Sequence, residues 1–289
     1  MPLVNTMTML RDAREKGYCV GAFNIVDYLT IEAVIEAAER MNAPAIIQTS
    51  SASIKRFGIK TLVEMTRTAA EGSTVPLSLH LDHGTDRQRL SEAIQLGFNS
   101  VMIDASSYSF EENVRITKEV VEEAHAKGIS VEGEIGIVAG VEDDIVVSCD
   151  EAIYTTPKEA IEFHDRTKID FLAAAIGTAH GFYKVEPKLN IGTLRDIHAQ
   201  TDYPLVVHGG TGLDDDTVKQ LVAAGGSKFN VSTHIKQVYI DAMYGYIDGK
   251  RNEYNILKVL ACAKNELTEM IAEYIALLGG EGKAPGVSI

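Results

Sequence analysis

The sequence predicts an α/β protein that folds as one (β/α)8 barrel with extra C-terminal helices. Short apolar segments typical of buried strands alternate with amphipathic helical segments, and this unit recurs roughly every 30 residues. No Pro-, Gly- or Ser-rich linker interrupts the 289 residues, a length common among single-domain barrels. An open doubly wound sheet is the alternative, but such sheets rarely contain so many units without a second domain. We therefore expect one domain over residues 1–289.

The individual elements follow from apolar periodicity and from helix start and stop signals. Ile31, Val34 and Ala38 share one face of the first expected helix, Gly128 ends another helix, and Pro157 occupies a first turn. Residues 136–150 combine glycines and acids without a helical period, which predicts a long functional loop. The expected strands cover residues 18–24, 44–49, 76–84, 98–104, 129–135, 169–177, 204–208 and 227–231. The expected helices cover residues 28–41, 59–70, 86–96, 110–127, 157–167, 192–200 and 214–224, with helical residues again from 233 to 278.

The composition limits the class of protein. Apolar residues make up 45% and charged residues 24%, as in ordinary globular proteins, and the net charge of −14 argues against binding to nucleic acid or to an anionic membrane. The cysteines Cys19, Cys149 and Cys262 lack metal-type spacing and fit reduced thiols. The sequence shows no apolar run of transmembrane length and no signal peptide. We therefore expect a cytoplasmic protein.

Histidines gather at the carboxyl ends of the expected strands, where the active sites of barrels lie. His83 ends the third strand, His180 and His208 follow the sixth and seventh, and each precedes a glycine. Three histidines that leave one coordination position open are typical of catalytic Zn²⁺, although any one of them alone would more often be an ordinary loop residue. Because neighbouring residues of a strand point to opposite faces, Asp82 and His83 share the barrel mouth only if the strand bends there. We assign no ligand role to the other histidines, which lie within strands or helices: His80, His125, His164, His198 and His234.

Two turns are expected to bind phosphate. Residues 209–212 (Gly-Gly-Thr-Gly) directly precede a helix, and residues 230–233 (Asn-Val-Ser-Thr) precede the last helical region. Backbone N–H groups at a helix N-terminus favour anions, and the phosphate sites of barrels commonly follow strands seven and eight. A plain turn is the alternative for the glycine-rich segment, but its position beside His208 favours phosphate binding.

Seven motifs occur in order along the chain: residues 80–84 (HLDHG), 101–104 (VMID), 131–136 (VEGEIG), 142–143 (ED), 177–184 (GTAHGFYK), 208–212 (HGGTG) and 230–231 (NV). Together they resemble the class II, metal-dependent fructose- and tagatose-bisphosphate aldolases over essentially the whole chain. The resemblance implies a lyase that reversibly cleaves a phosphorylated ketose, such as fructose or tagatose 1,6-bisphosphate, into dihydroxyacetone phosphate and an aldehyde.

The resemblance also implies roles for individual residues. His83, His180 and His208 would bind Zn²⁺, with Asp104 and Glu134 at a secondary or resting metal position. Asp82 would be the acid/base at the aldehyde-derived hydroxyl, and Glu142 the base for the dihydroxyacetone phosphate carbon, both at a solvent-accessible rim. The substrate and its phosphate, with a monovalent cation (Na⁺ or K⁺) beside it, would be bound by residues at the strand ends: Asn24, Ser50, Gly181, Lys184, Gly209, Gly210, Thr211, Asn230, Ser232 and Thr233.

Two departures from the family pattern bear on the substrate. Ser232 stands where the family often has an acidic residue or alanine, and residues 252–254 read Asn-Glu-Tyr where the family has Asp-Pro-Arg. In fructose-bisphosphate aldolases an arginine from that region helps to bind the distal phosphate, so Lys250 or Arg251 would have to replace it here. The alternatives are a class II aldolase acting on another dihydroxyacetone phosphate adduct, such as 6-phospho-5-dehydro-2-deoxygluconate, and a non-catalytic aldolase-like partner subunit.

The closing helical segment predicts self-association. Residues 257–278 carry a stripe of largely apolar side chains with more apolar area than one barrel-side helix needs, and the family is commonly dimeric or tetrameric. We therefore expect a homodimer or homotetramer. The stripe consists of Leu260, Lys264, Leu267, Ile271 and Ile275.

Overall fold

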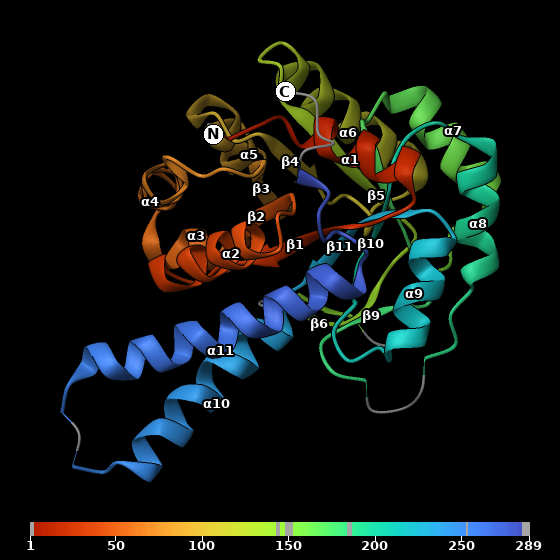
Figure 1. The fold of residues 1–289 in the computed structure, drawn as a ribbon. Helices are drawn as coiled ribbons and strands as arrows, with labels where there is room; N and C mark the ends of the chain where they lie inside the picture. The colour runs from red at the N-terminus through yellow and green to blue at the C-terminus, as the bar shows by residue number, and fades with distance from the viewer. Residues whose placement is uncertain (1–2, 143–144, 148–152, 184–186, 253, 285–289) are drawn as a thin grey trace.

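The computed structural model describes residues 3–142, 145–147, 153–183, 187–252 and 254–284; at 141–142 and 145–147 only the backbone is described. Its centre is a closed barrel of parallel strands, which confirms the predicted fold (Figure 1). Around the barrel the strands follow the order β1-β11-β10-β8-β5-β4-β3-β2. Their bounds are β1 Val20–Asn24, β2 Ala45–Thr49, β3 Leu77–Gly84, β4 Ser100–Ile103, β5 Ser130–Ile135, β8 Phe171–Ala174, β10 Leu205–Val207 and β11 Gly226–Val231.

The helices that link successive strands lie within one or two residues of their predicted bounds. The differences arise at the caps: Asp86 and Asp214 lie just outside their helices, where each carboxylate accepts hydrogen bonds from the first-turn backbone. Such capping stabilises a helix start by roughly 1 kcal/mol. These outer helices are α2 Tyr28–Arg40, α4 Ile59–Ala70, α5 Arg87–Leu96, α6 Phe110–His125, α7 Pro157–Thr167, α8 Ile191–Gln200 and α9 Asp215–Ala223.

Two helices are absent from the sequence prediction. Helix α3 (Ser51–Phe57) is a short helix after β2 that begins after the cap residue Ser50. Helix α1 (Thr6–Lys16) buries Met9 and Leu10 against barrel-interior side chains, so it closes the amino-terminal end of the barrel. In Figure 1, α1 lies at the end of the barrel opposite the short strands β6 and β9.

The segment expected to be one long loop contains a β-hairpin instead. Strands β6 (Ala139–Glu142) and β7 (Ile145–Val147) pair in antiparallel fashion, and β6 also pairs with β9 (Ala179–His180). The β-branched residues of this segment favour extended backbone, which explains why it is not an irregular loop. The hairpin therefore lies beside His180, and a Cβ at Gly140 would approach the His180 carbonyl oxygen to 2.2 Å.

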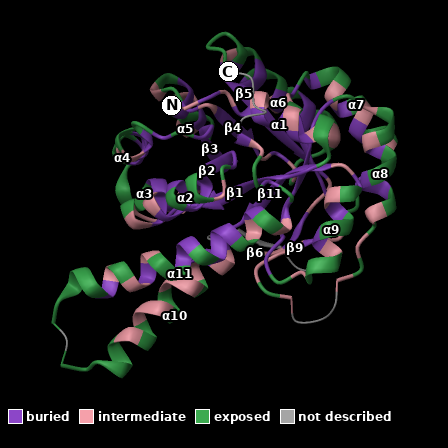
Figure 2. Cartoon of the chain, in the orientation of Figure 1, coloured by how far each residue is buried: buried purple, intermediate pink, exposed green. Residues whose placement is uncertain are grey.

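The C-terminal helices α10 (Thr233–Gly249) and α11 (Ile256–Leu277) form a hairpin that projects from the barrel (Figure 1). The later part of α11 packs on α2, where Leu267, Ile271 and Ile275 are buried. Much of the apolar stripe expected to face a partner thus packs within the chain. Towards its free end the hairpin is largely exposed (Figure 2), and the exposed apolar residues of its two helices include Ile240 at 65% and Leu257 at 72% exposure. Among the described residues, no helix is long and apolar enough to cross a membrane.

Candidate active site

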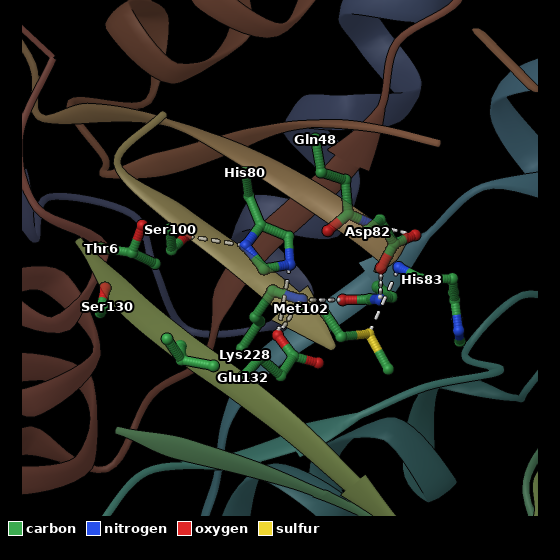
Figure 3. Close-up of polar contacts among 12 residues, drawn as sticks. Thr6, Gln48, His80, Asp82, His83, Ser100, Met102, Ser130, Glu132 and Lys228 are labelled. Carbon is green, nitrogen blue, oxygen red and sulfur yellow. Dashed lines mark hydrogen bonds and ion pairs between the residues drawn. The ribbon is translucent and has the colours of Figure 1, made fainter. Parts of the chain in front are cut away.

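A bend at the end of β3 brings Asp82 and His83 to the same side of the barrel wall. His83 has φ 46°, in the left-handed region that a residue other than glycine seldom adopts, and the pairing of β3 with β4 shifts register between Leu81 and Gly84. The backbone N–H of His83 points to the sulfur of Met102 at 3.4 Å (Figure 3). This bend breaks the strand alternation, as the sequence required if both side chains serve one site.

The three histidines singled out in the sequence come together at the carboxyl ends of the strands. The ring centroids of His83 lie 5.0 Å from His180 and 4.8 Å from His208, and one ring nitrogen from each residue falls within 4.8 Å of the other two. Nδ1 of His208 lies 3.1 Å from Nε2 of His83. Two nitrogens bound to one tetrahedral Zn²⁺ lie roughly 3.4 Å apart, so this spacing and the all-imidazole donor set fit zinc.

Asp104 and Glu134 lie beside this cluster. Oδ2 of Asp104 is 2.9 Å from Nδ1 of His83, and both the backbone N–H and the hydroxyl of Ser106 donate to Oδ1. Burial opposes ionisation of Asp104, but the contacts with His83 and Ser106 outweigh it and lower its pKa. Burial and the neighbouring Asp104 raise the pKa of Glu134 well above its usual range, and Glu134 Oε2 has no hydrogen-bond partner among the described residues. His83, Asp104 and Glu134 form a second group with metal-ligand spacing.

Asp82 is enclosed by amide side chains rather than exposed at a rim. Its Oδ2 accepts hydrogen bonds from Asn24 at 3.0 Å and Gln48 at 3.3 Å, and its Oδ1 accepts one from Asn230 at 3.2 Å. The side chain is fully buried, which corrects the expectation of a solvent-accessible position. The three amides fix the carboxylate in one orientation, and they are also the reason it tolerates burial.

A fully buried set of charged groups lies on the barrel side of His208. Lys228 Nζ is 2.9 Å from Oε2 of Glu132 (Figure 3), and Glu132 Oε1 is 2.7 Å from Nε2 of His208. Burial would raise the pKa of Glu132, but the Lys228 ammonium and the His208 hydrogen bond lower it. Burial lowers the pKa of His208 despite that hydrogen bond. His80, which received no ligand role, faces this set at 3.4 Å from Glu132 Oε2.

The loop after β10 approaches the segment that carries His180. Gly209 has φ 65°, and a Cβ there would meet the Ala179 carbonyl oxygen at 2.5 Å, so the close approach requires glycine. The Tyr183 hydroxyl joins the two segments: it accepts from the Ala179 backbone N–H at 2.9 Å and donates to the Gly209 carbonyl at 2.6 Å. Gly210 and the buried Thr211 continue this loop.

The other expected substrate-binding residues have varied surroundings. Ser50 caps α3, and Thr233 opens α10 directly after Ser232, whose buried Oγ has no hydrogen-bond partner within the described ranges. Gly181 follows His180, and Asn230 bonds to Asp82 and to Lys228. Glu142 ends β6, but its side chain, like the whole of Lys184, lies outside the described part of the chain.

The proposed substitutes for the missing arginine do not lie at this site within their own chain. Lys250 stacks over Tyr246 at 4.3 Å, and Arg251 donates to Asp248 at 2.7 Å. Figure 1 places the connection between α10 and α11 at the free end of the hairpin, away from β9. A monomer therefore brings neither cation to the mouth of its own barrel.

Comparison with known proteins identifies the family. The model of the family described as fructose-bisphosphate aldolase class-II matches residues 4–283. The chain belongs to the class II fructose-bisphosphate aldolase family. It is thus a class II aldolase, a carbon–carbon lyase that cleaves a ketose phosphate, and the family implies a divalent metal.

Relatives of this class II aldolase differ in their named substrates. It is 41% identical to a fructose-bisphosphate aldolase of Staphylococcus aureus, over 98% of this chain and the whole of the relative. It is 39% identical to a sulfofructosephosphate aldolase of Alkalicoccus urumqiensis, over 98% and 99% of the two chains. Among solved structures, the YdjI aldolase of Escherichia coli K12 matches with a TM-score of 0.87 and 33% identity, over 98% of this chain and 99% of the other.

Sequence reasoning missed three residues of this aldolase that contact the expected site residues. Gln48 and Lys228 are polar side chains within fully buried barrel strands, and such a side chain requires a buried partner that the sequence does not name. Tyr183 lies inside a quoted motif, but nothing in the motif shows that its hydroxyl reaches Gly209.

Proposed function

We propose that this aldolase binds Zn²⁺ through His83, His180 and His208 and reversibly cleaves a ketose 1,6-bisphosphate, such as fructose or tagatose 1,6-bisphosphate, into dihydroxyacetone phosphate and an aldehyde. The observation that carries the proposal is the convergence of three imidazoles beside an enclosed carboxylate, Asp82, at one barrel mouth. Held by these three histidines, Zn²⁺ would supply a Lewis acid to stabilise the negative charge that develops beside the ketone. Asp104 and Glu134 would form a second metal position.

The chain's own acids divide the proton transfers. Asp82, fixed by its three amide donors, takes the proton from the hydroxyl of the aldehyde-derived carbon as the carbon–carbon bond breaks. Glu142, carried by the β6–β7 hairpin beside His180, returns a proton to the carbon of the dihydroxyacetone phosphate fragment. The two acids thus act on opposite sides of the broken bond.

The phosphate site is assigned to the loops after β10 and β11. The loop from Gly209 to Thr211, together with Asn230, Ser232 and Thr233 at the start of α10, offers backbone N–H groups and hydroxyls. A monovalent cation, Na⁺ or K⁺, beside the phosphate would be bound by the carbonyls of Gly181 and Gly209. The remaining proposed substrate contacts come from Asn24, Ser50 and Lys184.

A second substrate is favoured by a specific observation. Residues 252–254 lack the arginine that serves a distal phosphate, and one relative that matches over the full length is named for a sulfonated ketose phosphate. A sulfonate carries one negative charge where a phosphate carries nearly two, so its site needs less cationic charge. Sulfofructosephosphate is therefore the second candidate.

Substrate profiling tests both proposals. The zinc-loaded protein is assayed for release of dihydroxyacetone phosphate from fructose 1,6-bisphosphate, tagatose 1,6-bisphosphate, sulfofructosephosphate and 6-phospho-5-dehydro-2-deoxygluconate. We expect kcat/KM to be highest for a ketose 1,6-bisphosphate. A clear preference for sulfofructosephosphate selects the second candidate, and a lack of cleavage of all four substrates by zinc-loaded protein rejects both.

A further inference from the structure

The buried pair Glu132 and Lys228 lies directly behind one of the proposed zinc ligands. Both side chains have no exposed surface, and they come from β5 and β11, on either side of β8 and β10 in the barrel. Lys228 Nζ is 2.9 Å from Glu132 Oε2 and donates to Asn230 Oδ1 at 2.7 Å. A buried ion pair of this kind is weak evidence for stability, because removing both charges from water costs about as much as their attraction returns. Its position next to His208 points to another role.

The contacts of His208 determine which nitrogen carries the proton. Lys228 Nζ can only donate and lies 2.9 Å from one carboxylate oxygen of Glu132, while Nε2 of His208 lies 2.7 Å from the other oxygen, which places Nε2 as the donor to Glu132. Asn230 Nδ2 lies 3.4 Å from the same nitrogen, but the amide donates to Asp82. With Nε2 as the donor to Glu132, the lone pair of the ring is on Nδ1, which faces His83 Nε2 at 3.1 Å.

His83 shows the same arrangement in mirror order. Its Nδ1 lies 2.9 Å from Asp104, which leaves Nε2 to face His208. The lone pairs of His208 Nδ1 and His83 Nε2, at 3.1 Å, repel each other unless a cation lies between them. Glu132 and Asp104 therefore direct both lone pairs to one place, which favours a bound cation. A carboxylate that holds the outer nitrogen of a ligating histidine in this way fixes the tautomer and the ring orientation.

We propose that Glu132, held in place by Lys228, is a positioning residue that presents Nδ1 of His208 to the zinc ion. The inference rests on the proposed zinc site. Lys228 adds a second effect, because the same ammonium orients the Asn230 amide that donates to Asp82. One buried cation thus aligns a metal ligand through Glu132 and an acid/base carboxylate through Asn230.

Two double variants isolate the hydrogen bond from the charges. Glu132→Gln with Lys228→Met removes both charges but keeps an oxygen that accepts from His208. Glu132→Leu with Lys228→Met removes both charges and the acceptor as well. Neither leaves an unpaired buried charge, so the two variants differ chiefly in the acceptor that faces Nε2. Thr6→Val is the matched control: it removes a buried hydroxyl bonded to Ser78 and Ser100 in the same barrel interior, without contact with a proposed ligand.

The readouts are the Zn²⁺ dissociation constant, measured by competition with a chromophoric chelator, and the urea midpoint of the metal-free protein. We expect the Leu/Met variant to bind Zn²⁺ roughly 10–100-fold more weakly than the Gln/Met variant, as is typical when the outer partner of a ligating histidine is lost. The control should lose stability and keep its Zn²⁺ affinity. Equal affinities of two folded double variants would show that the pair is only structural and would overturn the proposal.

A measurement on the wild-type protein covers the case in which the Leu/Met variant does not fold. Nitrogen NMR of ¹⁵N-histidine-labelled, metal-free protein should show the His208 proton on Nε2 and none on Nδ1. A proton on Nδ1 of neutral His208 would overturn the proposal without any variant. If the wild type binds no Zn²⁺ but shows the Nε2 proton, the proposed zinc site fails while the positioning of His208 stands.

Discussion

Replacing Asp82 with alanine tests the proposal that Asp82 and Glu142 transfer different protons in the reaction. The structure sets the expected size of two effects. Loss of the acid/base group should lower turnover roughly 10²–10⁴-fold. Loss of the carboxylate also leaves the amides of Asn24, Gln48 and Asn230 without their acceptor. A hydrogen bond to a charged group contributes about 1.5–3 kcal/mol, and water from the mouth will replace part of it, so we expect the free energy of unfolding to fall by roughly 2–5 kcal/mol.

The assay separates bond cleavage from proton transfer at the other carbon. Solvent-isotope exchange into dihydroxyacetone phosphate does not use the cleaved hydroxyl, so Asp82→Ala should retain exchange and bound Zn²⁺ while it loses cleavage. Glu142→Ala should suppress the exchange directly. Gln48→Leu is the control: it removes one of the hydrogen bonds that orient Asp82 but keeps the carboxylate itself. Its turnover should fall by no more than about tenfold.

Two results would refute this reasoning. If Glu142→Ala exchanges at the wild-type rate while Asp82→Ala does not, the roles of the two acids are reversed. If both variants cleave the substrate at the wild-type rate, neither residue is catalytic.

Three further predictions concern the metal, the assembly and the phosphate loops. The purified protein should contain about one Zn²⁺ per chain, and chelation should abolish cleavage but leave the far-ultraviolet circular dichroism nearly unchanged; full activity in chelator would contradict the zinc mechanism. Because Ile240 and Leu257 are exposed on the projecting hairpin, sedimentation should give a dimer or tetramer, and Leu257→Glu should shift the mass towards the 31.4 kDa chain; a wild-type mass of one chain would exclude self-association. Tyr183→Phe loses the hydroxyl that joins Ala179 to Gly209, so KM for the phosphorylated substrate should rise about tenfold with little change in kcat; an unchanged KM would separate this bond from phosphate binding.

The periodicity of apolar residues predicted most of the fold because each strand–helix unit of the barrel has its own pattern in the local sequence. The bounds of α4 and α7 agree with the prediction, since apolar spacing and a first-turn proline are visible in the sequence. Helix α1 was missed because its few apolar residues, such as Met9 and Leu10, stand among charged ones, and only the open end of a barrel explains their burial. The β6–β7 hairpin was missed because its strands are short and gain their partner, β9, from a distant part of the chain.

The site divides in a similar way. The clustering of the three histidines could be predicted because residues at strand ends come together whenever a barrel closes. The surroundings of Asp82 were not, because the hydrogen bond from Asn230 depends on the exact register of strands far apart in sequence. Likewise, a lysine at position 228 within a buried strand indicates only that an acid must face it, and Glu132 lies three strands away around the barrel.

The closure of the barrel by β1 and β11 has a consequence for how the chain folds. β1 and β11 are the first and last barrel strands in the sequence, and they pair with Val20 opposite Lys228. The pairing therefore spans most of the sequence. Contacts of such long range form slowly, and a ribosome releases β11 only after the other strands have emerged. Until then α1 lacks one of the barrel strands that it contacts, and Glu132 and His208 lack the ammonium of Lys228. We therefore expect the metal-binding geometry to mature with the final strand, so that a nascent chain acquires the ability to hold zinc only as its synthesis ends.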